Sequence, residues 1–384
     1  MSNLNFLYRQ KPHYELLDGL RGVAALLVIW YHFFEGFATS GVDQNFNHGY
    51  LAVDFFFVLS GFVIGYAYDD RWKKGLTKGE FIVRRIIRLQ PMVVMAVCLG
   101  IIAYIIQGCE HWDHTKANTW AIIASFVFGL FMLPAIPGTE PDVRGNGEMF
   151  PLVGPAWSLF FEYIGSVLYA LWLHQLTTRA LRIVVIVCAL GLSAVALTNM
   201  SGVFSLGVGW SLAEWGFMGG LMRLGFSFGI GLLMSRNFKP IKIRGAFWIC
   251  TIVIIVLMCM PYVSFTGEPS ILNSIYDIIC TLFVFPFVVY LGASGKTTDS
   301  SSSRICNFLG IISYPIYIIH YPAMYLFYAW VWNNGFTFGD VWPVTVIIFI
   351  ILIPIAYLFV RVYDQPIRKW LTFKFRTYQT KEGI

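Results

Sequence analysis

Charged residues are scarce in this chain: only 12% of its 384 residues are Asp, Glu, Lys or Arg, whereas soluble proteins average about 25%. Hydrophobic residues make up 57% and aromatic residues 17%, and the mean hydropathy is +0.67. This composition excludes a water-soluble globular protein. The remaining charges fall between apolar runs of about 18 to 22 residues, the length that spans a hydrocarbon core of about 30 Å. The sequence therefore predicts an all-α integral membrane protein.

Paired cysteine spacings are also absent. The seven cysteines show no C-x-x-C pattern and lie mostly inside apolar runs, which argues against a disulfide framework and against a metal site. The net charge of +6 does not indicate a nucleic-acid partner, because the basic residues cluster beside apolar runs, at 84–88, 236–244 and 368–376. The positive-inside rule accounts for clusters of this kind at the cytoplasmic ends of membrane spans.

Eleven apolar runs are candidate membrane spans. They are 17–38, 49–68, 91–108, 119–137, 156–175, 181–198, 214–234, 245–263, 273–293, 307–330 and 341–363. The first run contains charged residues and leads to no small-residue cleavage site, so we interpret it as a helix of the mature protein and not as a signal peptide. The basic loops and both termini are predicted to be cytoplasmic, which requires an even number of crossings.

One of the eleven runs therefore should not cross. The run 119–137 ends in Pro134, Pro137 and Gly138, and we expect it to lie in the interface or to re-enter the membrane. About ten transmembrane helices result, with 138–155 as an outward-facing loop that walls a substrate mouth. A topology that differs by one span remains the alternative, because the charge bias in this region is weak.

Three parts follow from this topology. Residues 1–15 form a cytoplasmic N-terminal segment, 16–366 form the transmembrane domain, and 367–384 form a cytoplasmic basic tail.

Two ionisable residues in the first run are the sharpest functional candidates, because a charge at membrane depth is expensive and tends to be functional. Arg21 and His32 are eleven residues apart, which is about three helical turns, so they share one helix face about 16 Å apart. A buried neutral imidazole is well suited to accept a proton from a hydroxyl. A structural histidine bonded to a neighbouring helix is an equal alternative.

In the second run, 49–68, Asp54 begins an aromatic-rich helix whose Ser60-Gly61 pair permits close helix approach. Asp54 could orient His32 or Arg21, or it could only mark the outer end of a helix.

Three arginines follow the first basic loop. Arg84, Arg85 and Arg88 have helical i, i+3 and i+4 spacing, and we expect them on a short cytoplasmic helix that Pro91 ends. Clustered guanidinium groups suit phosphate ligands, although a positive-inside flank would show the same pattern.

Two later segments add candidates. Pro155 is placed to start a helix, and Glu162 would then lie about 9 Å into it, too deep for a surface carboxylate, so it should face a cavity. Tyr314, Tyr317 and His320 recur every third residue. For these three we favour a packing stripe with an outer histidine that snorkels.

The order of these motifs resembles acyltransferase family 3 of membrane proteins. The resemblance spans about 16–366 and is carried by L-D-G-L-R-G with the R-x10-H spacing (Asp18, Arg21, His32), D-F-F-F-V-L-S-G-F (Asp54, Ser60), R-R-x-x-R (Arg84, Arg85, Arg88), W-S-L-x-x-E (Trp157, Glu162) and Y-P-I-Y-I-I-H (Tyr317, His320).

The resemblance implies a membrane-bound O-acyltransferase with ten spans in the cytoplasmic membrane. It would move an acyl group, by family habit acetyl from acetyl-CoA, to a hydroxyl of a carbohydrate or lipid-linked acceptor. The CoA phosphates would lie near Arg84, Arg85 and Arg88, and His32 would act as general base or carry the acyl group. Arg21 would anchor CoA or polarise the donor, and Glu162 would position the acceptor or the imidazole. Whether transfer is direct or passes through an acyl-histidine stays open.

Two other classes remain alternatives. A proton-coupled transporter would also bury His, Glu and Arg, but it would show internal repeats, and none is evident. A non-catalytic scaffold would bury few ionisable groups. Outer-loop tryptophans could stack on sugar rings, although an interfacial belt is the favoured interpretation for Trp210, Trp215, Trp332 and Trp342. Some family members carry an extra C-terminal hydrolase-like domain, whereas this chain is expected to act alone on an acceptor delivered to the membrane surface.

Overall fold

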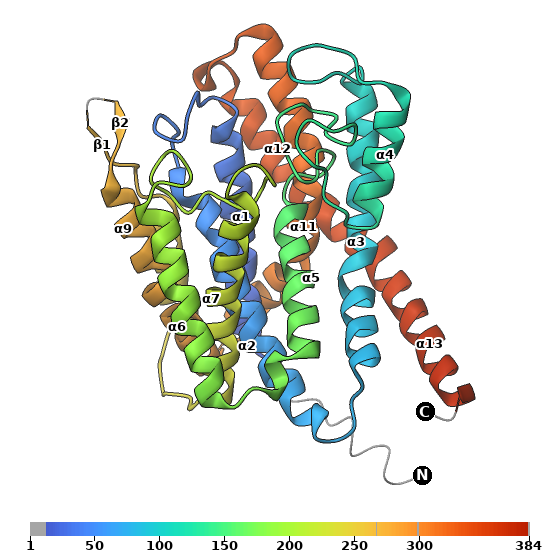
Figure 1. Ribbon diagram of the computed structural model, residues 1–384, viewed down its shortest axis with the longest axis vertical. Helices are drawn as coiled ribbons and strands as arrows, with labels where there is room; N and C mark the ends of the chain where they lie inside the picture. The colour runs from blue at the N-terminus through green and yellow to red at the C-terminus, as the bar shows by residue number, and fades with distance from the viewer. Residues whose placement is uncertain (1–12, 266, 298, 383–384) are drawn as a thin grey trace.

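The computed structural model describes residues 13–265, 267–297 and 299–382, and most of them are helical (Figure 1). In chain order the elements are α1 (Glu15–Glu35), η1 (Asn47–Leu51), α2 (Ala52–Trp72), α3 (Lys78–Ile106), α4 (Thr119–Leu130), α5 (Ala156–Leu171), η2 (Leu173–Gln175), α6 (Thr178–Leu197), α7 (Gly216–Arg236), α8 (Ala246–Met258), β1 (Ser264–Phe265), β2 (Glu268–Pro269), α9 (Ile271–Ile279), η3 (Cys280–Val284), α10 (Phe285–Ser294), α11 (Ser300–Asn334), α12 (Phe338–Phe359), η4 (Val360–Asp364) and α13 (Gln365–Glu382). The strands β1 and β2 form a two-stranded antiparallel hairpin.

Seven helical segments within the described residues are long and apolar enough to cross a membrane. They are α1, η1 with α2, α3, α6, α7, α9 with η3 and α10, and α12 with η4 and most of α13. Three shorter apolar helices, α4, α5 and α8, and the 35-residue α11 complete the bundle. The predicted helical membrane protein is confirmed, whereas the count of ten crossings and the side on which the termini lie stay predictions.

The exterior of the bundle is apolar. Exposed aliphatic side chains line the outward faces of several helices, among them Ile183, Val187 and Leu190 on α6, Ile252 and Val256 on α8, and Ile347, Ile350 and Leu358 on α12. A surface of this kind is solvated by lipid and not by water. The chain is therefore an integral membrane protein.

Helix α4 stops halfway along its neighbour α3. The side-chain amide of Gln90, near the middle of α3, donates a 2.6 Å hydrogen bond to the carbonyl of Leu130, where α4 ends. The chain then runs through the irregular segment 131–155 before α5 begins at Ala156. This course is visible at the upper right of Figure 1, and the expectation that 119–137 lies in the interface or re-enters the membrane stays a prediction.

Two expectations about helix ends have different outcomes. Pro155 immediately precedes α5, as predicted. Pro91, however, does not end a short helix, because α3 continues through it for another fifteen residues to Ile106. Neighbouring helices in a bundle can satisfy the backbone groups that a proline disturbs, and Tyr314 donates a 2.6 Å hydrogen bond to the nearby Leu89 carbonyl. Most of the predicted N-terminal segment 1–15 lies outside the described residues.

Helices α1 and α11 pack so closely that two glycines are required at the contact. A Cβ added at Gly22 would lie 2.5 Å from the Leu309 carbonyl oxygen, and one at Gly310 would lie 2.7 Å from the Asp18 Cβ. Small residues permit this close backbone approach inside a membrane. The contact brings the polar face of α1 against the tyrosine-rich face of α11.

We expect Gly22→Ala to lower the thermal stability of the detergent-solubilised protein, because the methyl group meets backbone that cannot rotate away. Overpacking of this kind costs about 1–3 kcal/mol. The control is Gly79→Ala on α3, where an added Cβ meets nothing within 4 Å. Thermal scans followed by size-exclusion chromatography should show a lower midpoint for Gly22→Ala alone, and equal midpoints would contradict the close contact.

Candidate functional site

Two cavities lie inside the bundle and share part of their walls. The arginine-lined cavity has a volume of about 430 Å³ and is bordered by Arg21, Arg85, Arg88 and Arg368. The histidine-lined cavity has a volume of about 220 Å³ and is bordered by His32. Val53 and Tyr317 line both.

His32 is hydrogen-bonded to a carboxylate on its own helix. Its Nδ1 lies 2.8 Å from Oε2 of Glu35, one turn further along α1, and both residues line the histidine-lined cavity. The hydroxyl of Tyr328 donates to the same carboxylate oxygen at 3.1 Å. A carboxylate at Nδ1 favours the tautomer with the proton on Nδ1, which leaves the Nε2 lone pair as the base.

Helix α11 packs its aromatic residues around this pair. The ring of Tyr321 lies edge-on to the His32 ring with a centroid distance of 4.8 Å, and its hydroxyl is 3.4 Å from Glu35. The His320 ring lies 5.4 Å from the His32 ring. His320 is fully buried, so the expected snorkelling to the outer surface is wrong: the close approach of α11 to α1 turns this ring toward the interior.

The arginine-lined cavity contains most of the predicted anion-binding residues. Arg85 pairs with Glu162 and donates a 3.1 Å hydrogen bond to Ser166. Ser60 donates to the same carboxylate oxygen that Arg85 contacts, with its Oγ 3.0 Å from Oε1 of Glu162. Arg88 also lines this cavity. The prediction that Glu162 faces a cavity is confirmed, but its contacts are with Arg85 and Ser60, and not with His32.

Arg84 differs from its two neighbours. It is not among the residues that line the arginine-lined cavity, and its buried Nε has no hydrogen-bond partner among the described residues. A residue outside the predicted cluster, Arg368 on α13, lines the cavity instead and pairs with Asp364 at 3.1 Å.

Arg21 is held at the same cavity by α11. Its Nε donates a 2.8 Å hydrogen bond to Ser313, and its Nη2 lies 3.0 Å from Asp18. Asp18 also accepts from His13, at 2.8 Å, and this hydrogen bond raises the pKa of the His13 imidazole above its usual value. The guanidinium is therefore fixed by both helices.

Tyr317 separates the two cavities. Its hydroxyl lies 2.7 Å from the hydroxyl of Ser158 on α5, and its ring contacts Phe56 with a centroid distance of 5.4 Å. Tyr317 and Val53 thus form the part of the wall that the two cavities share. Trp157, the neighbour of Ser158, lines the histidine-lined cavity.

Asp54 does not contact His32 or Arg21 but forms a buried ion pair with Arg223 on α7. Its carboxylate is fully buried and lies 2.7 Å from Nη2 of Arg223. Arg223 also donates to the carbonyl of Val208 at 2.7 Å and to that of Tyr50 at 2.9 Å. The pair thus ties α2 and α7 to η1 and to the loop that carries Val208.

Two residues of this site could have been found from the sequence. Glu35 stands at i+3 from His32 in H-F-F-E, which places it on the same helix face. Arg223 is an ionisable residue inside the apolar run 214–234, the same signal that pointed to Arg21 and His32. Within the described residues, no group of three or more His, Cys, Asp or Glu side chains could hold a metal ion.

The structure thus defines a helical membrane protein with one anion-suited cavity and one histidine-carboxylate cavity. The family model described as "Acyltransferase domain" matches residues 14–361. The chain belongs to this acyltransferase family, and it is an enzyme.

Relatives of this chain come from bacteria. It is 37% identical over 188 residues to "Protein 2 in picA locus" of Rhizobium radiobacter, covering 47% of this chain and 93% of that protein. It is 30% identical over 158 residues to the peptidoglycan O-acetyltransferase OatA of Listeria monocytogenes, covering 38% and 24%. It is 26% identical over 140 residues to the exopolysaccharide production protein ExoZ of Rhizobium meliloti, covering 35% and 37%. No solved structure matches this chain.

We expect Arg223→Met to destabilise the protein strongly, because it leaves the Asp54 carboxylate buried without its partner. Breaking a buried pair costs about 3–5 kcal/mol. The double variant Asp54→Asn/Arg223→Met carries no unpaired charge and should recover much of the loss. Thermal unfolding in detergent checks both, and a double variant less stable than Arg223→Met would argue against the pair as the cause.

Proposed function

We propose that this enzyme transfers a short acyl group from acyl-CoA to a hydroxyl of a carbohydrate or lipid-linked acceptor. The observation that carries the proposal is the position of the His32–Glu35 pair, in a cavity that shares Tyr317 and Val53 with a second cavity lined by arginines. An acyl donor in the arginine-lined cavity and an acceptor in the histidine-lined cavity can thus meet at His32. The names of two relatives, a peptidoglycan O-acetyltransferase and an exopolysaccharide production protein, support a polysaccharide acceptor and an acetyl group.

The donor enters the arginine-lined cavity. Guanidinium groups bind phosphates through paired, charge-assisted hydrogen bonds, and four arginines border this cavity, on α1, α3 and α13. We assign the phosphate contacts of CoA to Arg21, Arg85, Arg88 and Arg368, with Arg84 outside the cavity wall. Glu162 and Ser166 hold Arg85 in place, and Ser60 donates a hydrogen bond to Glu162. With Asp18 and Ser313 fixing Arg21, the anion site is arranged before the donor arrives.

The donor side is the cytoplasm in this proposal. The basic loops and the tail predict cytoplasmic termini and ten crossings of the bacterial cytoplasmic membrane, and both described ends of the chain lie at the same end of the bundle (Figure 1). The acceptor then arrives from the opposite side.

Chemistry takes place at His32. Its Nε2 removes the proton of the acceptor hydroxyl while that oxygen attacks the thioester carbonyl. A carbon–oxygen bond forms, the carbon–sulfur bond breaks, and the leaving thiolate of CoA takes the proton back from the imidazolium. Glu35 keeps the imidazole in the required tautomer and stabilises the transient positive charge. In the alternative sequence His32 Nε2 first accepts the acyl group and then passes it to the hydroxyl.

The first test is release of free CoA from acetyl-CoA by the purified protein, with and without a pool of membrane glycans. His32→Ala should lose the glycan-dependent release, because the base or acyl carrier is gone, and Glu35→Gln should reduce it about 10²-fold or more. Both variants should elute at the wild-type position on size exclusion.

If His32→Ala keeps full activity, the histidine is structural. If the wild-type protein neither consumes nor binds acyl-CoA, the donor assignment is wrong, and proton-coupled transport becomes the function to examine.

The arginine-lined cavity has its own test. Arg88→Ala should raise KM for acetyl-CoA and leave kcat nearly unchanged, because it removes binding that the ground state and the transition state share. A charge-assisted hydrogen bond contributes about 1.5–3 kcal/mol, so the expected rise is roughly 10- to 150-fold. Lys78→Ala, an exposed charge at the start of the same helix, is the matched control. An unchanged KM in Arg88→Ala would place the phosphates elsewhere.

A further inference from the structure

Two loops that lie far apart in the sequence meet at the histidine-lined cavity. The segment 131–155 contributes Asn146 and Glu148 to the cavity wall, and the segment 199–213 contributes Gly207 and Trp210. The backbone amide of Met149 donates a 2.9 Å hydrogen bond to the Trp210 carbonyl, and an antiparallel bridge pairs Glu148 with Ser211. The four wall residues are therefore held in one arrangement.

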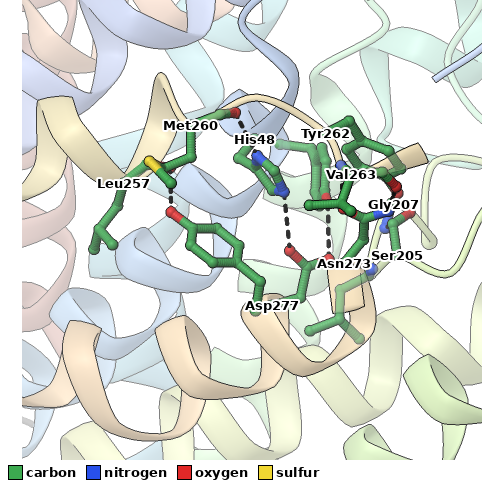
Figure 2. Close-up of polar contacts among 12 residues, drawn as sticks. His48, Ser205, Gly207, Leu257, Met260, Tyr262, Val263, Asn273 and Asp277 are labelled. Carbon is green, nitrogen blue, oxygen red and sulfur yellow. Dashed lines mark hydrogen bonds and ion pairs between the residues drawn. The ribbon is translucent and has the colours of Figure 1, made fainter. Parts of the chain in front are cut away.

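A buried carboxylate anchors the second loop from behind (Figure 2). Asp277 on α9 accepts a 2.8 Å hydrogen bond from the backbone amide of Leu206 and a 2.7 Å hydrogen bond from the hydroxyl of Tyr50, another wall residue. Figure 2 shows His48 on its other side, with Nε2 at 3.8 Å. Since Asp277 is fully buried, these contacts are shielded from water, and the wall is preorganised.

The wall combines a flat apolar surface with planar hydrogen-bonding groups. Trp210 and Trp157 supply indole faces, and 44% of Trp210 is exposed. The side-chain amide of Asn146 donates a 2.9 Å hydrogen bond to Glu148, whose other oxygen accepts from Tyr325. A sugar ring presents the complementary pair of surfaces, an apolar face of C–H groups and an equator of hydroxyls, and amphipathic aromatic rings suit such a ligand.

The size of the cavity limits what can enter. Its volume is about 220 Å³, below the range of about 300–1,000 Å³ typical of sites for drug-sized ligands. One monosaccharide unit fits a space of this size, and the rest of a glycan must stay outside the mouth.

The charges in the wall disfavour an acidic ring. The one arginine in the wall, Arg223, makes hydrogen bonds to Asp54, Tyr50 and Val208 through all three of its nitrogens. The two carboxylates, Glu35 and Glu148, would face an incoming anion. A buried carboxylate brought next to another is strongly disfavoured, so the ring should be uncharged.

We propose that Trp210, Asn146 and Glu148 form an acceptor subsite that binds one uncharged pyranose ring and presents its hydroxyl to His32. This inference rests on the proposed acyl transfer and adds which residues recognise the acceptor. Trp210 stacks on the face of the ring, and Asn146 and Glu148 bind its hydroxyls.

The experiment measures acetyl transfer from acetyl-CoA to methyl β-D-glucopyranoside and to methyl β-D-glucuronide, together with the hydrolysis of acetyl-CoA without an acceptor. Trp210→Ala and Glu148→Gln should each raise KM for the glucoside about tenfold, because each removes a contact to the sugar ring. Trp210→Tyr should restore a KM near that of wild type, because it keeps an aromatic face. The matched controls are Trp120→Ala, an exposed tryptophan on α4, and Glu140→Gln, an exposed carboxylate in the loop that carries Glu148.

The outcomes separate the two proposals. Wild-type KM values in Trp210→Ala and Glu148→Gln, or a glucuronide accepted as well as the glucoside, would overturn the subsite while acyl transfer stands. Hydrolysis of acetyl-CoA with no transfer to either glycoside would also overturn it and leave the donor half of the function intact. If wild type consumes no acetyl-CoA under any condition, the proposed function fails, and the subsite fails with it.

Discussion

The contact between α1 and α11 holds Arg21 and His32, one candidate residue of each cavity, in place. Gly22 and Gly310 leave no room for a methyl group between the two backbones. At one end of the contact, Arg21 therefore reaches Ser313 on α11. Near the other end, the His32 ring meets Tyr321, and the Tyr328 hydroxyl reaches Glu35. Helix α1 carries both Arg21, the proposed anion-binding residue, and His32, the proposed base, so a shift of one helix against the other would disturb both cavities together.

The division into two cavities separates the cluster of arginines from the His32 imidazole, which need different surroundings. An array of arginines needs anions and tolerates water, whereas an imidazole base works best with few competing proton donors. Tyr317 and Val53 are all that the two lining sets share. Behind the histidine-lined cavity, the Asp54–Arg223 pair and Asp277 fix loops and not substrates. The polar groups of this membrane interior thus fall into those that line the cavities and those that hold the surrounding helices and loops together.

Patterns within single helices predicted much of this arrangement, and contacts between helices were the part that could not be predicted. The spacing of Arg21 and His32 placed both on one face of α1, and the depth of Glu162 pointed to a cavity; the structure agrees on both. The partner of Asp54 is on α7, 169 residues away, and no local pattern indicates it. The orientation of His320 depends on how α11 lies against α1, and periodicity along α11 does not report it. The continuation of α3 through Pro91 depends on neighbours that a single-helix rule does not include.

The Asp54–Arg223 pair has a consequence for biogenesis. Its two members belong to helices that leave the ribosome at different times, and each alone is unfavourable in lipid by about 2.5–3.5 kcal/mol on insertion scales. The 169 residues between them take on the order of ten seconds to synthesise at about 5–20 residues per second. During that interval α2 carries an unneutralised carboxylate, and only the arrival of α7 completes it. A nascent chain that stalls before α7 would therefore expose the unpaired Asp54 carboxylate within the bilayer. Membrane proteases and insertases can use such an unpaired charge to distinguish incomplete chains from complete ones.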